Sequence, residues 1–266
     1  MSGPLVVVEK KDRVATLTID NPSQRNALSF EVVDELAEAL RDLKADSDLL
    51  AVVLTGAGKV FSSGGDLKSM VPPQGGEGGV SDEEIADYIK SYYRKNLSIL
   101  DLPMCTIAAI NGHAIGAGCT LALACDMRIA STEAKLGMGF VKIGLHPGMG
   151  TTFFLPRLVG TARAYELLLT GEPISGEEAA RIGMVNRAVE PEDVLDAALE
   201  LAHKIARGPA IPIRRLKDSV GNSHARDLEE TLHLEARMQV ECSKTKDLKE
   251  GITAFLERRQ PSFEGR

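Results

Sequence analysis

Residues 104–124, MCTIAAINGHAIGAGCTLALA, place an apolar run, a turn with several glycines and a second apolar run in direct succession. The first run, residues 104–110, is typical of a strand that is covered on both faces of a sheet. Residues 111–119 carry the glycines, and the apolar run at 118–124 predicts a buried helix. This stretch therefore predicts a strand that enters a helix through a tight turn.

A second stretch of the same kind lies upstream. Residues 50–55 form another continuous apolar run, Gly56-Ala57-Gly58 ends it, and a further glycine-bearing turn follows at 60–67. Between the two stretches, residues 82–100 have the apolar spacing of an amphipathic helix. Strand, helix and strand in this order predict a right-handed βαβ unit with a parallel sheet, and hence an α/β fold.

Turn and capping signals predict the other elements. From Thr161 onward the chain is expected to be largely helical, and residues 71–81, rich in Gly, Pro and acidic residues, to form a mobile surface loop. The N-terminal elements are a hairpin of residues 5–9 and 14–19, a turn at 21–26 and a helix capped by Ser29 that ends near Lys44. The later elements are a strand at 126–130, a capping box formed by Ser175 and Glu178, and a last helix at 247–259.

The composition excludes several classes of protein. The chain has 266 residues, of which 44% are apolar, and a formal net charge of −7. It can therefore bury a substantial core, and it is a poor binder of nucleic acid. No apolar run approaches the roughly 18 residues that span a membrane, and no secretory signal is visible. The cysteines lack metal-ligand spacing, which favours buried thiols. We expect a cytoplasmic protein without metal, nucleic-acid or membrane partners.

The two glycine-bearing turns can present backbone N–H groups to a ligand. Small residues let a ligand approach the main chain, and a turn that enters a helix has N–H groups without partners. Two such groups that converge on one point form an oxyanion hole, which holds a carbonyl oxygen as it gains negative charge. A dinucleotide-binding fingerprint would need a third glycine where Leu121 stands. Each turn, taken separately, also has a purely structural interpretation.

Several short motifs follow one another along the whole chain. They are Asn21-Pro22, Asn26-Ala27-Leu28, Phe61-x-x-Gly64-x-Asp66-Leu67, Asn111-Gly112, Gly116-x-Gly118-Cys119, Cys125-Asp126, Gly144-Leu145-x-Pro147-Gly148, Arg157-Leu158-x-Gly160, Leu169-Thr170-Gly171 and Ala179-Ala180-x-x-Gly183-Met184-Val185. In this order they resemble the crotonase (enoyl-CoA hydratase/isomerase) superfamily.

The resemblance implies a fold and a substrate class. The fold is a crotonase-like spiral of ββα units over residues 1–200, with a helical C-terminal trimerisation region over residues 201–266. The substrate is an acyl-coenzyme A thioester, so coenzyme A is part of the substrate and no cofactor is tightly bound. The resemblance also implies a homotrimer or a homohexamer.

The same resemblance assigns roles to individual residues. It places the two oxyanion N–H donors at Gly65 and Ala117. Ser63 and Leu67 are expected to contact the adenine and pantetheine portions of the ligand. Arg25, Lys68 and Arg258 are expected to contact its phosphates, Arg258 in a neighbouring subunit's site. The other residues expected to line the site are Ala27, Asp66, Gly116, Phe140 and Gly148. Asp66 also has a structural interpretation as a cap, and Gly148 is expected to leave room for the acyl group.

The sequence departs from the superfamily at the two positions that carry glutamates in its hydratases. These positions hold Thr120 and Phe140, and neither side chain is an ordinary general base near neutral pH. Thr120 is interpreted as a hydrogen-bonding residue. His146 titrates in a useful range, so it is either the proton carrier or a histidine bonded to loop backbone. His113 is expected to pack in the core.

Three functions stay open on these residues. The first is hydration or double-bond isomerisation of an enoyl- or dienoyl-CoA with an unusual proton carrier. The second is decarboxylation or hydrolysis of an acyl-CoA, which relies on the oxyanion hole and on little acid–base chemistry. The third is acyl-CoA binding without catalysis. A proton-transfer enzyme needs a polar residue that faces the reacting carbon, whereas a binding protein needs only the hole and a pocket.

Overall fold

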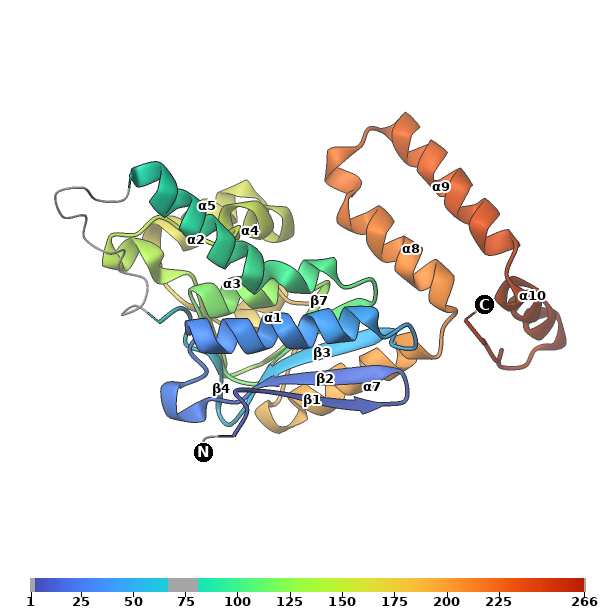
Figure 1. Ribbon diagram of the computed structural model, residues 1–266, viewed down its shortest axis with the longest axis horizontal. Helices are drawn as coiled ribbons and strands as arrows, with labels where there is room; N and C mark the ends of the chain where they lie inside the picture. The colour runs from blue at the N-terminus through green and yellow to red at the C-terminus, as the bar shows by residue number, and fades with distance from the viewer. Residues whose placement is uncertain (1–2, 67–80, 266) are drawn as a thin grey trace.

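The computed structural model describes residues 3–66 and 81–265. Within them, a six-stranded sheet has the order β1-β2-β3-β5-β7-β10 (Figure 1). The pair β1/β2 is the predicted antiparallel hairpin, and the later pairs are parallel. The strands are β1 (Val6–Lys11), β2 (Val14–Ile19), β3 (Ala51–Gly56), β5 (Cys105–Ile110), β7 (Met127–Ser131) and β10 (Arg187–Val189). The predicted parallel α/β sheet is confirmed.

Three strands that directly follow main-sheet strands form a second sheet with β9, in the order β4-β6-β8-β9. A short turn leads from β3 into β4, from β5 into β6 and from β7 into β8, so the chain visits the two sheets alternately. The strands are β4 (Val60–Ser62), β6 (His113–Ile115), β8 (Lys135–Gly137) and β9 (Ile174–Ser175). This alternation, interrupted by helices, is the spiral of ββα units implied by the resemblance.

Helices cover both faces of the main sheet. Val52 and Leu54 of β3 pack into the core on the α1 side, while Ala51 and Val53 pack against α7, because side chains alternate along a strand. Because both faces are covered, all six residues of β3 are buried, and the first four are apolar. The helices are α1 (Phe30–Ala45), α2 (Asp82–Asn96), α3 (Ala117–Leu123), α4 (Thr151–Val159), α5 (Thr161–Thr170), α6 (Gly176–Arg181) and α7 (Val194–Ala206), with 3₁₀ turns at η1 (Pro22–Gln24), η2 (Leu97–Asp101), η3 (Gly139–Ile143), η4 (Pro191–Asp193) and η5 (Ser223–Ala225).

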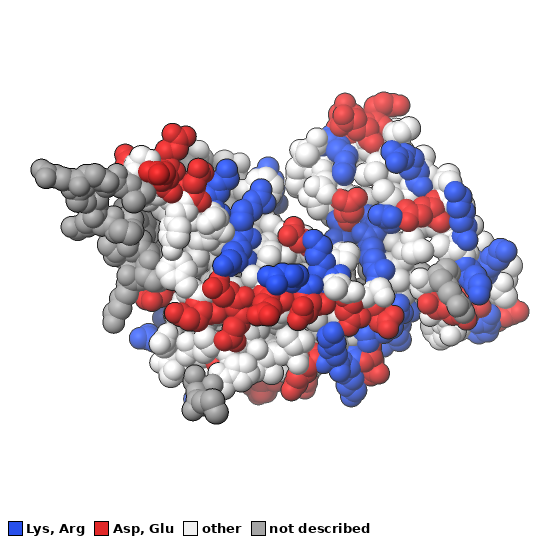
Figure 2. All heavy atoms as spheres, viewed as in Figure 1, with Lys and Arg blue, Asp and Glu red and all other residues white. Residues whose placement is uncertain are grey.

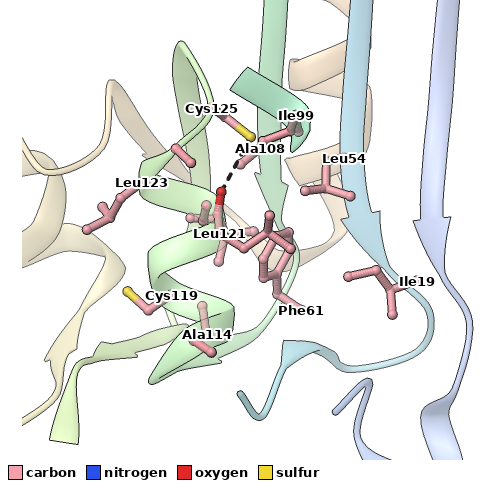
Figure 3. Packing of buried hydrophobic residues seen from close by; sticks show 14 of the residues in the cluster. Ile19, Leu54, Phe61, Ile99, Ala108, Ala114, Cys119, Leu121, Leu123 and Cys125 are labelled. Atoms are coloured by element: carbon pink, nitrogen blue, oxygen red, sulfur yellow. Dashed lines mark hydrogen bonds between the residues drawn. The ribbon is translucent and has the colours of Figure 1, made fainter. Parts of the chain in front are cut away.

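The core that supports the glycine-bearing turns is centred on Phe61 of β4. Phe61 is completely buried, and Figure 3 shows it between Leu54 of β3 and Leu121 of α3. Burial raises the pKa of the Cys119 and Cys125 thiols to about 12, so both stay protonated near neutral pH. The predicted buried thiols are thus confirmed for these two and for Cys105; Cys242, the fourth cysteine, is half-buried. Phe61 fixes α3, and with it the second turn, relative to β4.

The C-terminal helices α8 (Ala210–Gly221), α9 (Leu228–Ser243) and α10 (Lys246–Glu257) extend away from the two sheets (Figure 1). They carry unusually exposed apolar side chains: Leu228 is 74% exposed, Leu256 74% and Phe255 82%. The largely helical C-terminal part predicted from the sequence is confirmed, apart from the short strands β9 and β10. Its apolar surface is available to a partner.

The surface is mainly acidic where α1 faces solvent. Figure 2 shows Asp and Glu side chains along this helix, with basic side chains spread around them and over the C-terminal helices. Within the described residues, no helix is both long enough and apolar enough to cross a membrane.

Two local predictions need correction. The surface loop predicted at 71–81 is described only at Ser81, an exposed residue outside the helix whose side chain accepts from the Glu84 N–H and caps α2; residues 71–80 lie outside the described residues. The α-helical part of α2 ends at Asn96 rather than near residue 100. At Ser175 half of the capping box forms: its hydroxyl accepts from the Glu178 N–H, while the Glu178 carboxylate instead pairs with Arg181.

Candidate active site

A buried asparagine anchors the segment that precedes the first glycine-bearing turn. Asn26 is completely buried, and its Oδ1 accepts from the Asn21 N–H at 3.0 Å. Its Nδ2 donates to the carbonyl oxygens of Ala57 at 2.9 Å and Val60 at 2.6 Å. Asn26 also has a φ of 53°, a left-handed conformation that asparagine tolerates better than most residues. These bonds hold residues 21–26 against the chain that enters β4.

Main-chain bonds then bring the predicted contact residues together. The Ser63 N–H donates to the Arg25 carbonyl at 3.0 Å. The Ser62 hydroxyl donates to the Asn26 carbonyl at 2.8 Å and accepts from the Gly64 N–H at 3.2 Å. The bonds on either side of Ala27 therefore bring Arg25, Ala27, Ser63 and Gly65 close together at the first turn. The Arg25 side chain is exposed there.

The two glycine-bearing turns meet backbone to backbone. Strands β4 and β6 pair in parallel, so the turns that follow them leave the same edge of the second sheet. Gly64 has a φ of +98°, and a Cβ atom on it would lie 2.6 Å from the Ile115 carbonyl oxygen and 3.4 Å from the Ala117 nitrogen. A Cβ atom on Gly118 would lie 2.6 Å from Cβ of Ser62. Only glycine permits this approach.

The adjoining turns carry the two predicted N–H donors. Ala117 is the first residue of α3, where a helical N–H has no partner within the helix. Neither the Ala117 N–H nor the Gly65 N–H has an acceptor among the residues that the structure describes. Ala117 is 5% exposed and Gly65 is half-buried. Two backbone N–H groups on neighbouring turns are thus left without acceptors among the described residues.

A pair of buried threonines lies one helical turn behind Ala117. The hydroxyls of Thr120 and Thr151 are 2.6 Å apart, and both side chains are completely buried. Thr151 donates to the Gly148 carbonyl at 2.7 Å, while Thr120 lies 3.2 Å from the Gly116 carbonyl. Two hydroxyl protons serve three contacts, so the two short distances indicate a chain in which Thr120 donates to Thr151 and Thr151 to Gly148. The Thr120 hydroxyl is therefore occupied within the protein.

Phe140 lies beside the second turn. It is 9% exposed within η3, and its Cζ atom would be 3.9 Å from a Cβ atom on Gly116. A phenyl ring exchanges no protons, so this neighbour of the turn supplies only apolar surface.

The two histidines considered for the site, His113 and His146, are both exposed. Nδ1 of His146 lies 2.8 Å from the Pro147 carbonyl oxygen, so Nδ1 carries a proton and donates it. This is the loop-backbone bond considered for His146. His113 does not pack in the core as expected: its Nδ1 accepts from the Lys135 N–H at 3.1 Å. Side chains alternate along β6, so His113 points outward and Ala114 inward.

Gly148 does not leave open room in the way that was expected. A Cβ atom on Gly148 would lie 2.7 Å from Cζ of Tyr93 and would collide with the Tyr93 hydroxyl. The space beside this glycine is thus taken by a side chain from α2. Tyr93 is half-buried, and burial raises the pKa of its phenol above the usual value.

A comparison with known families decides the family of the chain. The sequence profile of the family described as "Enoyl-CoA hydratase/isomerase" matches residues 9–266. The chain belongs to the enoyl-CoA hydratase/isomerase family. This match covers both turns and the C-terminal helices.

Individual members of the enoyl-CoA hydratase/isomerase family agree with this placement. The short-chain-enoyl-CoA hydratase of Clostridium acetobutylicum is 37% identical over 259 residues, 96% of this chain and 95% of that protein. The crotonyl-CoA hydratase of Syntrophomonas wolfei is 34% identical over 262 residues, 97% of each chain. The crystal structure of an enoyl-CoA hydratase from Bacillus anthracis superposes with a TM-score of 0.89 at 34% identity, covering 98% of this chain and 100% of that one. The predicted crotonase fold is confirmed.

The remaining expected ligand contacts of this family member are spread more widely. Arg258 ends α10 in a left-handed conformation with φ of 54°, on the helices that extend away from the turns. Asp66 follows Gly65 directly and is half-buried. Leu67 and Lys68 lie outside the described residues. Sequence reasoning missed Tyr93 and Thr151, which reach the site from elements far from either turn.

Proposed function

We propose that the protein binds acyl-CoA thioesters and polarises their carbonyl group through the N–H groups of Gly65 and Ala117. The observation that carries this proposal is the contact between the two turns, each of which has a backbone N–H without an acceptor among the described residues. A thioester oxygen that accepts both bonds can carry more negative charge. The enolate that forms when the α-carbon of the thioester loses a proton or carbon dioxide is therefore stabilised. Each donor of this kind typically contributes about 2.7–4 kcal/mol to stabilising a transition state.

The proposed reaction does not use a pair of carboxylates. Thr120 and Phe140 occupy the positions where the hydratases of the superfamily carry glutamates, the Thr120 hydroxyl is bonded to Thr151, and His146 is exposed. The protein is therefore proposed to process acyl-CoA thioesters as an enoyl-CoA hydratase/isomerase-type enzyme that lacks ordinary hydratase activity.

Decarboxylation or hydrolysis of an acyl-CoA is the second candidate. The absence of a titratable side chain at positions 120 and 140 favours it, because loss of carbon dioxide needs a stabilised enolate more than it needs a general base. Mass spectrometry of the products from a panel of acyl-CoAs in heavy-oxygen water, a malonyl thioester included, separates the reactions. Hydration and hydrolysis incorporate the label, isomerisation does not, and decarboxylation shortens the acyl group. Binding without any product would indicate a non-catalytic acyl-CoA-binding protein.

We expect the protein to bind acyl-CoA thioesters and not the corresponding free acids. The thioester offers a carbonyl to the two N–H donors and phosphates to exposed cations such as Arg25. Isothermal titration calorimetry with acetyl-, butyryl- and octanoyl-CoA, each matched with its free acid, measures the difference. If none of the three thioesters binds, the proposed function is wrong.

A trimer or a dimer of trimers is the proposed assembly. Leu228, Phe255 and Leu256 expose large apolar side chains on helices that pack little against the sheets, and burying such surface against a second copy is favourable. We expect light scattering at micromolar concentration to report three or six times the mass of one chain. A monomer would contradict the assembly and would leave Arg258 without a neighbouring site to reach.

A further inference from the structure

The three tyrosines of α2 differ in what their hydroxyls contact. Tyr88 is 56% exposed and packs its ring against Phe30. The Tyr92 hydroxyl donates to the Leu28 carbonyl at 2.6 Å. The Tyr93 hydroxyl has no acceptor among the described residues, although the side chain is half-buried. Of the three, Tyr93 thus combines partial burial with a hydroxyl that has no acceptor among the described residues.

The position of α2 relates these hydroxyls to the two turns. The Leu28 N–H donates to the Gly64 carbonyl at 2.8 Å, so Tyr92 docks the helix onto the segment beside the first turn. Tyr93 instead meets Gly148, whose missing side chain makes space for the phenol. The two neighbouring rings, with centroids 6.4 Å apart, therefore contact different parts of the site.

Gly148 in turn is tied to the second turn. Its carbonyl accepts from Thr151, and Thr151 meets Thr120, which lies one turn along the helix that Ala117 begins. The Tyr93 phenol is thus connected by direct contacts to α3, the helix that carries the Ala117 N–H. A tyrosine phenol is neutral near neutral pH and can donate its proton in a hydrogen bond, and burial raises the pKa of Tyr93 further in the same direction.

We propose that the Tyr93 hydroxyl donates a hydrogen bond to an oxygen carried by the acyl group of the bound thioester. This inference rests on the proposed function and names its substrate class: acyl-CoAs whose acyl group bears a hydroxyl, carbonyl or carboxylate. A partly buried donor favours a ligand that offers an acceptor, and a site built to hydrogen-bond a ligand discriminates against the analogue that lacks the group. A purely alkyl acyl group leaves the phenol without a partner.

The test compares ligands that differ by one oxygen. Calorimetry measures butyryl-CoA, 3-hydroxybutyryl-CoA and malonyl-CoA on the wild type, on Tyr93→Phe and on Tyr88→Phe as the matched control from the same helix. One of the two oxygenated thioesters will bind more tightly to the wild type. Tyr93→Phe should lower the affinity for that thioester by about tenfold or more. Butyryl-CoA affinity should stay within about twofold on all three proteins, and Tyr88→Phe should change no affinity.

Two results overturn the inference while leaving the proposed function intact. One is an equal loss for butyryl-CoA and the oxygenated thioesters, which would make Tyr93 a structural residue. The other is no loss for any of them. If the wild type binds none of the three, the proposed function and this inference both fall. Thermal unfolding of the two variants shows whether a loss reflects folding.

Discussion

Crotonyl-CoA hydration by this protein is expected to be slower by about 10⁴-fold or more than by an enzyme with two catalytic carboxylates, because each general acid or base supplies about 10²–10⁴-fold. The two corresponding positions hold Thr120, whose hydroxyl is bonded to Thr151, and Phe140, whose ring lies against Gly116. The decrease of the enoyl thioester absorbance with time measures the rate. A turnover of about 10³ s⁻¹, near the upper end for enzymes in general, would contradict this expectation and would require an unrecognised acid.

A matched pair of substitutions at position 140 tests whether a missing carboxylate explains the slow hydration. Phe140→Glu places a proton-exchanging group beside the second turn, and we expect it to raise crotonyl-CoA hydration by about 10²-fold. Phe140→Gln has nearly the same shape but exchanges no proton, so it should leave the rate at the wild-type level. Equal gains from both would attribute the effect to polarity or to space rather than to proton transfer.

Replacing Ala117 by proline should lower turnover on the true substrate by about 10²–10³-fold. Proline lacks the N–H that the proposal assigns to the thioester oxygen, and proline is well tolerated at the first position of a helix, which Ala117 occupies in α3. The substrate is the one that product analysis identifies, and the loss should fall mainly on kcat.

Thr161→Pro is the control for this substitution. Thr161 is also the first residue of a helix that follows a glycine, and it is exposed. Both proteins should unfold at similar temperatures, and Thr161→Pro should retain wild-type turnover. Full activity in Ala117→Pro would exclude this N–H as a donor to the reacting carbonyl.

The parts of the fold that local patterns determine were predictable from the sequence. The helix that Ser29 caps, the antiparallel hairpin and the apolar strand β3 follow from capping, turn residues and two-sided burial. The outward direction of the His113 side chain was also predictable, because Ala114 beside it must face the core. The error there was to interpret one position by resemblance rather than by alternation.

Contacts between distant segments were not predictable in the same way. Tyr93 and Gly148 lie 55 positions apart (148 − 93) and meet through the packing of α2, for which neither residue carries a local signal. The same holds for Thr120 and Thr151, whose hydroxyls come together only once α3 and the start of α4 are in place. The oxyanion donors, the expected phosphate contacts and the trimer therefore stay predictions that rest on resemblance and on the geometry of the turns.

Both proposed oxyanion donors belong to the main chain, so no exchange of side chains at Gly65 or Ala117 removes them, proline excepted. The residues that would select the reaction, at positions 120 and 140, are side chains on neighbouring elements. On the proposed function, recognition of the thioester and choice of chemistry would thus be encoded separately. Such a scaffold can exchange one reaction for another through a few substitutions while holding its ligand in the same place, and a variant that has lost one activity is already a binding protein from which another can be built.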